Sequence, residues 1–320
     1  MKTIIITGGN AGVGFALAQR LLRDESESYK IILACRDKEK AHVAIQSLSA
    51  PSNHQVEFIH LDVASIKSIS LFATSFAETH SQLHVLFNNA GIMAGERRMS
   101  EDGLEMTVMT NHVGPTLLTA LLLPVLKKTA NSRIVFVSSE LHNSGKKVSL
   151  TPEFYVFSPD MVLISELRAG GRGPEFDLNN MDGAILYDSM LFYRNSKLFN
   201  VLASYHLVKL LAADQIPVIA VTPGWIPSTG LGRDSSLLVR LIMTYVVSWL
   251  PVTRTIEQGG EVFFQAATSD KFQRPGERMY VNAKGEEVAS SPESYDEAKI
   301  DALWKWTTEV LSSKGCAIGL

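Results

Sequence analysis

The chain has 320 residues, of which 46% are hydrophobic and 20% are charged, so it can form a large core and is not a disordered chain. Thirty basic and thirty-three acidic residues give a net charge of −3, so no basic excess favours nucleic-acid binding. The two cysteines, Cys35 and Cys316, exclude a disulfide scaffold and a cysteine-rich zinc module and favour a reducing, cytoplasmic location. We expect no metal site and no nucleic-acid partner.

Strands and helices are predicted to alternate through the first half of the chain. Apolar runs of strand length lie at 2–7, 31–35, 56–61, 83–88 and 133–138, and helical spacing lies between them at 12–22, 37–48, 65–78 and 112–128. Repeated β-α-β units of this kind predict parallel pairing with right-handed crossovers. The sequence therefore predicts an α/β protein, a Rossmann-type doubly wound parallel sheet of about seven strands with helices on both faces.

The second half is less regular. A long mixed segment precedes a long helix at about 188–213, a strand at 216–221, a helix near 256–267, a short strand near 279–281 and a helix near 295–311. No linker-like composition shift divides the chain, so residues 1–320 are predicted to form a single domain. Its expected parts are a dinucleotide-binding half (1–139), an insertion (140–187), a catalytic region (188–285) with a substrate lid (225–252), and a C-terminal helix (286–320).

No transmembrane segment is expected. The run Leu237–Leu250 is the longest apolar stretch, and its fourteen residues are too few to span a bilayer. A stretch that is apolar nearly all round must be buried, line a pocket or touch a membrane. A lid over a lipophilic substrate is our first interpretation. Peripheral membrane contact and an oligomer interface, such as that of a homodimer, are the alternatives.

A glycine-rich turn follows the first predicted strand. Glycines at 8, 12 and 14 allow close backbone approach, and the next helix presents its N-terminal N–H groups to a phosphate. The alternative is a turn that only packs a helix on a strand. Its position in an alternating chain favours a dinucleotide pyrophosphate site, for which the expected residues are Gly8, Asn10, Gly12, Val13 and Gly14.

The end of the second strand bears on the choice of cofactor. An acidic residue usually holds the ribose hydroxyls of NAD here, whereas this chain has Cys35 followed by Arg36. A guanidinium can pair with a 2′-phosphate, so NADP(H) is favoured. In the alternative, Arg36 is solvated and Asp37 binds ribose. Asp62 and Val63 lie where the adenine edge is expected, although Asp62 could instead cap the next helix.

Four Tyr-x-x-x-Lys pairs occur in the sequence. Their positions relative to the predicted helices and strands decide which pair is the catalytic candidate. The pairs are Tyr193/Lys197, Tyr205/Lys209, Tyr280/Lys284 and Tyr295/Lys299. Only Tyr193 is expected near the start of a helix whose beginning lies at the carboxyl edge of the sheet, where α/β enzymes place their chemistry. At i and i+4 the two side chains share a helix face, and an ammonium lowers the pKa of a nearby phenol. The alternative is a surface contact without function.

Polar residues end two more predicted strands. Asn88-Asn89-Ala90-Gly91 follows the fourth strand, where a cofactor ribose would pass, and Ser138-Ser139 follows the fifth, where a hydroxyl could bond a substrate carbonyl. Asn111 is expected to begin a helix beside them. Each feature alone is more often a turn or a cap. Their occurrence at successive strand ends favours an active site.

In this order the motifs resemble those of the short-chain dehydrogenase/reductase family. The resemblance covers about 1–285 and rests on Thr7-Gly8-x3-Gly12-x-Gly14, Asn88-Asn89-Ala90-Gly91, Asn111, Ser139, Tyr193-x3-Lys197 and Pro223-Gly224. Within the family, Ala34-Cys35-Arg36-Asp37 and Asn111-His112-Val113-Gly114 are similar to the retinol dehydrogenase and protochlorophyllide reductase branch. Fifty-three residues separate Ser139 from Tyr193, far more than in most members, which leaves the substrate open.

The resemblance implies a catalytic role for four residues. Tyr193 would be the acid/base, Lys197 would lower its pKa and hold the nicotinamide ribose, and Ser139 would bond the substrate oxygen. Asn111 would position a water that links Lys197 to solvent. The implied cofactor contacts are Asn89, Ala90, Gly91, Tyr193, Lys197, Pro223, Gly224, Ile226 and Thr229.

The leading hypothesis is therefore an NADP(H)-dependent oxidoreductase that interconverts a carbonyl and an alcohol. Its substrate would be bulky and lipophilic, such as a retinoid, a steroid or a polyketide of secondary metabolism. A reductase of C=C bonds, as in enones or protochlorophyllide, is the first alternative. A protein that binds NADPH without turnover is the second.

Overall fold

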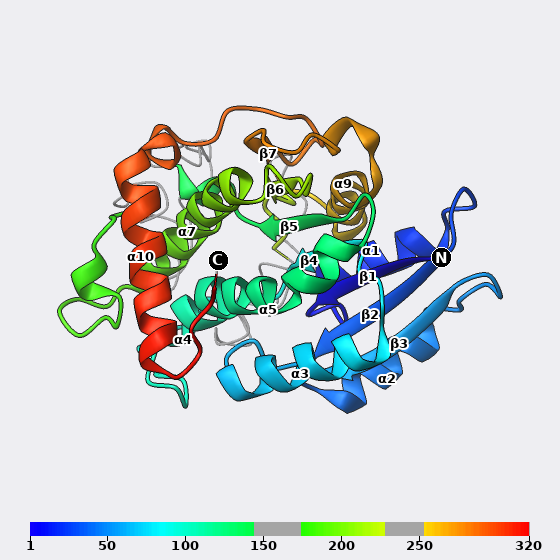
Figure 1. The fold of residues 1–320 in the computed structure, drawn as a ribbon, viewed down its shortest axis with the longest axis horizontal. Coiled ribbons are helices and arrows are strands. Elements are labelled where there is room, and N and C mark those ends of the chain that lie inside the picture. The colour runs from blue at the N-terminus through cyan, green and yellow to red at the C-terminus, as the bar shows by residue number, and fades with distance from the viewer. Residues whose placement is uncertain (144–173, 228–252, 320) are drawn as a thin grey trace, which may run out of the picture.

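A computed structural model of the protein describes residues 1–143, 174–227 and 253–319. Seven parallel strands form one sheet in the order β3-β2-β1-β4-β5-β6-β7, so the fold prediction is confirmed (Figure 1). The strands are β1 (Lys2–Thr7), β2 (Tyr29–Cys35), β3 (Gln55–His60), β4 (Val85–Asn88), β5 (Arg133–Val137), β6 (Val218–Val221) and β7 (Met279–Val281). The winding direction reverses between β1 and β4, which opens a crevice for a ligand at their carboxyl ends.

The strand sequences are continuously apolar because both faces of the sheet are covered. Ile5 pairs with Ile32 and Leu86, and all three face one core layer. Ile4 and Ile6, one position away, face the other layer. Each of these residues is 0% exposed, so the period of two sorts every strand into two buried sets.

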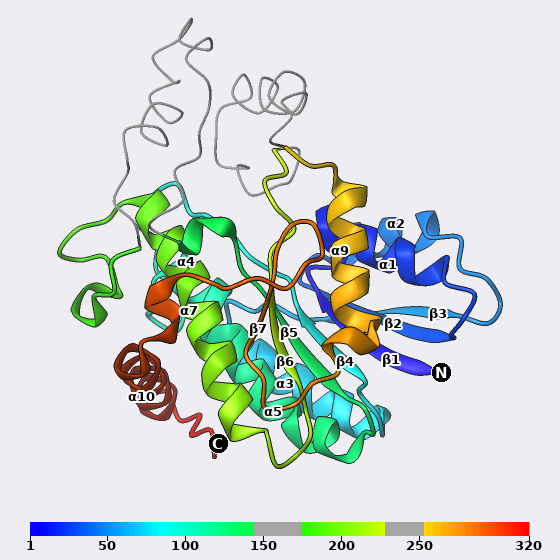
Figure 2. The ribbon, with the colours of Figure 1, turned by 90° about the horizontal axis from the view of Figure 1, so that it is seen from above.

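Helices cover both faces of the sheet (Figure 2). The layer that holds Ile4 and Ile6 is completed by α1 (Gly12–Leu22), α2 (Lys38–Ser47) and α9 (Ile256–Thr268). The opposite layer is completed by α3 (Ile66–Thr79), α5 (Gly114–Lys128), α7 (Ser189–Leu210) and α10 (Glu297–Ser313). Short 3-10 turns are η2 (Glu140–His142), η5 (Leu178–Asn180), η8 (Asp270–Phe272) and η9 (Pro292–Tyr295).

The helix that carries Asn111 begins earlier than predicted. Glu105 caps α4 (Met106–Val108) by accepting from Val108 N at 2.8 Å, and the π-helical turn η1 (Met109–Val113) joins α4 to α5. The expectation that Asn111 begins a helix is therefore wrong, because the cap lies six residues upstream. A π-helical turn inside an α-helix is frequent at functional sites.

One helical run in the described part of the chain is long and apolar enough to cross a membrane. It is Met106–Lys128, and 83% of its most apolar window is buried inside the protein. The same run supplies Leu117, Leu118 and Leu122 to the core. A buried core helix meets the same length and composition test, so this run is weak evidence for a membrane span.

Two predicted segments lie mainly outside the described residues. These are the insertion 140–187, of which 144–173 are not described, and the lid 225–252, of which 228–252 are not described. Thr229 falls in the second gap. Their predicted roles, and the division of the chain into parts, stay predictions.

Gly114 lies where α5 touches the loop after β3. A Cβ atom there would be 2.1 Å from Val63 O and 3.0 Å from Met109 O. We expect Gly114→Ala to lower the free energy of unfolding by about 1–3 kcal/mol, because overpacking forces the backbone apart. Urea unfolding measures this. Leu121→Ala, on the exposed side of the same helix, is the control and should lower the free energy of unfolding by less. Equal losses of stability in the two variants would contradict the explanation by close approach at Gly114.

Candidate active site

Most expected site residues of the described segments lie just after the carboxyl ends of β1, β2, β3, β4, β5 and β6, or in the first turns of α1 and α7. Asn111 lies in η1. Parallel strands bring their carboxyl ends to one edge of the sheet. Gly8 follows β1, Asn89 follows β4, Ser139 follows β5 and Pro223 follows β6. Positions far apart in the sequence are thereby assembled along one crevice.

The glycine-rich turn is shaped for close approach. Gly8 and Gly12 have φ of 65° and 57°, and α1 begins without a side-chain cap at Ala11. Its first N–H groups are therefore left for another acceptor. A Cβ atom on Gly14 would lie 2.5 Å from Asn89 Nδ2 and 3.0 Å from Gly8 O. Only glycine fits there, and the cradle suits a pyrophosphate.

The remaining turn residues flank this cradle. Asn10 is half-buried, and its backbone N–H bonds the Cys35 sulfur. Val13 is buried, and its Cγ1 would lie 2.9 Å from a Cβ atom on Gly259 of α9. Val13 therefore packs α1 against α9 as well as lying in the predicted phosphate turn.

Thr7 is a site residue that the sequence reasoning did not single out. Its Oγ1 accepts from Asn89 N and Ala90 N, both at 2.9 Å, and Asn89 Nδ2 donates to Thr7 O at 2.7 Å. The hydroxyl ties the end of β1 to the end of β4. Its position directly before the glycine turn was the available signal.

The end of β2 distinguishes Arg36 from Asp37. Asp37 caps α2, accepting from Lys40 N at 3.0 Å and pairing with Lys40 Nζ at 2.9 Å. Arg36 is exposed, and within the described residues its guanidinium forms no hydrogen bond or ion pair. Burial raises the pKa of the Cys35 thiol to about 12, although backbone N–H groups of Asn10 and Gly9 oppose the shift. Arg36 is therefore the side chain left for a ligand.

Asp62 and Val63 lie after β3. Asp62 Oδ1 accepts from Ala64 N at 2.9 Å, whereas Ser65 is the cap of α3. The alternative in which Asp62 caps that helix is wrong, because Ser65 Oγ already bonds Ser68 N. Val63 is 7% exposed, and its carbonyl touches Gly114.

Tyr193 and Lys197 share the inward face of α7, which Asp188 caps. Tyr193 is 8% exposed and Lys197 is 3% exposed, and Lys197 Nζ lies 5.5 Å from the Tyr193 ring centroid. The ammonium donates to Val137 O at 3.1 Å. Ser138 Oγ donates to Lys197 O at 2.7 Å, so Ser138 ties β5 to α7. Ser139 Oγ accepts from Leu141 N at 3.3 Å and bonds the Tyr193 side chain, and its role toward the substrate stays a prediction.

Burial dominates the pKa values of this pair. It raises the pKa of Tyr193 to about 12, and a hydrogen bond with Ser139 opposes the shift. Burial also lowers the pKa of Lys197 to about 8. The pKa of Tyr193 is thus raised and not lowered as predicted, because burial outweighs the opposing hydrogen bond.

Asn111 holds the neighbouring loop in place. Its Nδ2 donates to Ile92 O at 2.8 Å and to Ser196 Oγ at 2.9 Å, and its Oδ1 accepts from Ile92 N at 2.8 Å. A Cβ atom on Gly91 would lie 3.3 Å from Asn111 Oδ1 and 3.4 Å from Lys197 Nζ. Both amide hydrogens and one lone pair of Oδ1 are thus used by protein groups, and the water-positioning role of Asn111 stays a prediction.

The loop after β6 borders the same crevice. Gly224 has φ of 83°, and a Cβ atom there would lie 2.8 Å from both Ala283 Cβ and Arg254 Cδ. Ile226 is 5% exposed and touches Gly259 of α9. Pro223 also packs against Gly259. These residues place the loop beside α1 and the glycine-rich turn.

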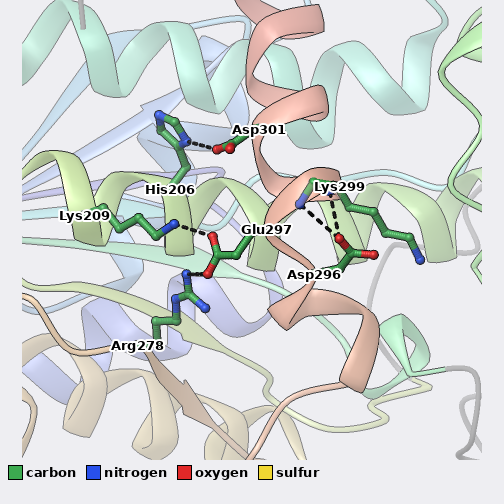
Figure 3. A network of polar contacts seen from close by, with 8 residues as sticks. His206, Lys209, Arg278, Asp296, Glu297, Lys299 and Asp301 are labelled. Carbon is green, nitrogen blue, oxygen red and sulfur yellow. Dashed lines mark hydrogen bonds and ion pairs between the residues drawn. The ribbon is translucent and has the colours of Figure 1, made fainter.

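The competing pair Tyr205/Lys209 is structural. Tyr205 is 0% exposed, and its hydroxyl lies 2.7 Å from Ser290 Oγ. Lys209 is exposed and pairs with Glu297 of α10, which also binds Arg278 at 2.5 Å (Figure 3). The two side chains serve different contacts. No group of three or more potential metal ligands occurs among the described residues.

The fold and this site define a dinucleotide-binding oxidoreductase, with a glycine cradle at β1 and a Ser-Tyr-Lys cluster at β5 and α7. Residues 2–150 match the family model "short chain dehydrogenase". The chain is 30% identical to a polyprenol dehydrogenase of Danio rerio, over 98% of this chain and 87% of that protein. It is 32% identical to retinol dehydrogenase 12 of Homo sapiens, over 97% and 86%. The chain belongs to the short-chain dehydrogenase/reductase family, in its retinol dehydrogenase-like branch.

Solved structures share this fold. A crystal structure of an uncharacterized protein from Mycobacterium paratuberculosis has a TM-score of 0.70 and 26% identity, and the match covers 100% of this chain and 96% of that one. An NADPH-bound carbonyl reductase from chicken fatty liver has a TM-score of 0.60 and 21% identity, over 90% and 99%. The second likeness shows the fold alone. Members of this family bind a nicotinamide cofactor, and the glycine cradle fits one.

Proposed function

We propose that the protein is an NADP(H)-dependent oxidoreductase that interconverts a carbonyl and an alcohol on a bulky lipophilic substrate. The observation that carries the proposal is the buried Tyr193, which lies between Ser139 and Lys197 at the carboxyl edge of the sheet. These are the groups that a proton transfer to a carbonyl oxygen requires.

Each residue has a defined part in this reaction. When bound, the nicotinamide supplies or accepts the hydride. Ser139 donates a hydrogen bond to the substrate oxygen, and Tyr193 donates the proton that the oxygen needs in reduction. Lys197 holds the ribose. Burial raises the pKa of Tyr193 to about 12, so the phenol carries the proton that it would donate in reduction.

Arg36 supports NADP(H) over NAD(H). Its guanidinium is exposed at the end of β2, while Asp37 is used to cap α2. A forked guanidinium pairs well with a phosphate monoester and adds little to a ribose without one.

We expect Arg36→Ala to lower kcat/KM for NADPH by about 10- to 100-fold, since hydrogen bonds between charged groups contribute about 1.5–3 kcal/mol. The kcat/KM for NADH should stay within a factor of about three of the wild-type value, because NADH has no 2′-phosphate whose contact could be lost. Steady-state kinetics with both cofactors measure the ratio. Arg23→Ala, an exposed arginine after α1, is the control. Equal losses with NADPH and NADH would refute the 2′-phosphate contact.

The lipophilic substrate class rests on two observations. Relatives named polyprenol and retinol dehydrogenases cover nearly the whole chain. The apolar run Leu237–Leu250 lies shortly after, in sequence, the loop that borders the cofactor crevice. Both support a long-chain alcohol or aldehyde over a small polar one.

A cofactor-consumption assay tests the proposal. The purified protein would receive NADPH in the dark with retinal, a polyprenal, a steroid ketone, small aldehydes and enones, and Tyr193→Phe would serve as the inactive control. Faster turnover of the long-chain carbonyls, lost in the variant, is the expected result. Turnover restricted to the C=C bond of enones, or turnover that survives in Tyr193→Phe, would overturn it.

A further inference from the structure

A buried histidine lies directly beside the backbone of Ser139. His142 ends the turn η2 and is 2% exposed. Its Nδ1 lies 2.6 Å from Ser139 O, and its backbone N donates to the same oxygen at 3.1 Å. The carbonyl of Ser139 is therefore held by two groups of one residue.

The second ring nitrogen defines the tautomer of His142. Ser291 N lies 3.0 Å from His142 Nε2, and a backbone N–H can only donate. Nε2 must therefore carry the lone pair, which leaves the proton on Nδ1. That proton is directed at Ser139 O, so the imidazole is a neutral bridge from Ser291 N–H to the Ser139 carbonyl.

The far end of the bridge is fixed to the C-terminal segment. Ser291 is 0% exposed, and Ser294 Oγ donates to its carbonyl at 2.6 Å. Ser290 Oγ lies 2.6 Å from Ser294 Oγ and 2.7 Å from the hydroxyl of Tyr205 on α7. The ring of His142 also packs on Tyr280, with 4.8 Å between the ring centroids.

Contacts between α7 and α10 hold the C-terminal segment that contains Ser291 in place. Glu297, at the start of α10, pairs with Lys209 of α7 and with Arg278, as Figure 3 shows. His206 of α7 stacks on Trp304 of α10 with 4.2 Å between the ring centroids. Ser291 therefore offers its N–H from a fixed position, although it is about 150 residues from Ser139 in sequence.

We propose that His142 is a positioning residue for Ser139 and that Ser291 orients it. This inference rests on the proposed role of Ser139 as the group that holds the substrate oxygen. The Oγ atom of Ser139 is carried by the backbone that His142 holds, so loss of the bridge lets the hydroxyl move away from Tyr193. A displacement of about 1 Å can lower turnover about 100-fold.

Two substitutions of His142 separate the effect of its hydrogen bonds from the effect of its packing. His142→Phe keeps a ring against Tyr280 but has neither nitrogen, and we expect kcat to fall about 10- to 100-fold. The KM and Kd for NADPH should stay at the wild-type values, because the glycine cradle is remote. His142→Asn can place an amide N–H near the position of Nδ1, and we expect it to recover much of the lost kcat. A kcat of His142→Phe equal to that of the wild type overturns the proposal.

A substitution at Ser291 tests the other end of the bridge. Ser291 has φ of −63°, which proline adopts, so Ser291→Pro removes the N–H donor without a change of backbone region. Ser291→Ala keeps the N–H and removes a hydroxyl that has no partner among the described residues. We expect Ser291→Pro to lower kcat and Ser291→Ala to leave it unchanged. The same kcat for both variants contradicts the bridge.

Amide hydrogen exchange gives a readout that does not depend on turnover. We expect faster exchange across 138–143 in His142→Phe and Ser291→Pro than in the wild type and Ser291→Ala. Unchanged exchange in both overturns the proposal even if no substrate is found. If Tyr193→Phe keeps full turnover, the proposed function fails. If Tyr193→Phe is inactive and His142→Phe is not, only the positioning role fails.

Discussion

Tyr193→Phe is expected to lower kcat by about 10²- to 10⁴-fold, the usual contribution of a positioned proton donor. The substitution removes one oxygen from a side chain that is 8% exposed, so the packing of α7 should be preserved. Two other buried phenols of the described segments have different surroundings, because Tyr205 is bonded to Ser290 and Tyr280 lies in β7. Single-turnover reduction with NADPH measures the chemical step directly.

The control for this prediction is Tyr29→Phe. Tyr29 is buried at the start of β2, where its hydroxyl bonds Asp24 at the edge of the sheet opposite to the crevice. Loss of the Tyr29 hydroxyl should leave kcat at the wild-type value. A Tyr193→Phe variant that retains more than about one tenth of the wild-type kcat would contradict proton donation by Tyr193.

Lys197→Met is expected to abolish turnover and to raise the stability of the cofactor-free protein. Lys197 is 3% exposed, and burial lowers its pKa from 10.5 to about 8, so the folded protein bears the cost of a buried charge at neutral pH. Methionine has a similar shape and no charge. Val137 O keeps a partner in the variant, because Asn200 Nδ2 also donates to it at 3.0 Å. We expect a gain of roughly 2–3 kcal/mol at pH 7.

The pH dependence of that gain has a definite sign. Between pH 8 and 10.5 the unfolded chain holds the Lys197 proton and the folded chain has released it, so the stability of the wild type rises with pH relative to the variant. The gain should therefore be complete below pH 8 and shrink above it. Urea unfolding at about pH 7 and pH 9.5 measures both values. A gain that does not depend on pH, or a less stable variant, would show that the ammonium costs the folded state nothing.

Much of the fold was predictable from local sequence. The helix at 12–22 and the strand at 279–281 agree with α1 and β7, because glycine turns and short apolar runs mark their limits. The start of the helix that carries Asn111 was not predictable in this way. Its cap is Glu105, an unusual capping residue, and the π-helical turn has no periodicity of its own.

Some features of the candidate site could also be predicted from the sequence, whereas others could not. The glycine spacing, Arg36 and the pair Tyr193/Lys197 could be found from the sequence, because each sits at a strand end or on one helical face. The family resemblance favoured Ser139 over Ser138 as the serine that faces the substrate. The structure adds that Ser138 is bonded to Lys197 O, and the role of Ser139 stays a prediction. The direction of the Tyr193 pKa shift likewise depends on burial by elements far away in the chain.

The amino-acid sequence by itself determined the alternating α/β order, the glycine cradle and the chemical groups of the site, since these follow from local periodicity and side-chain chemistry. Only the tertiary structure decided that Thr7 joins β1 to β4 and that His142 connects Ser139 to Ser291. These contacts join residues about 80 and 150 positions apart. No local pattern specifies them, because they arise only when helices and strands pack into one core.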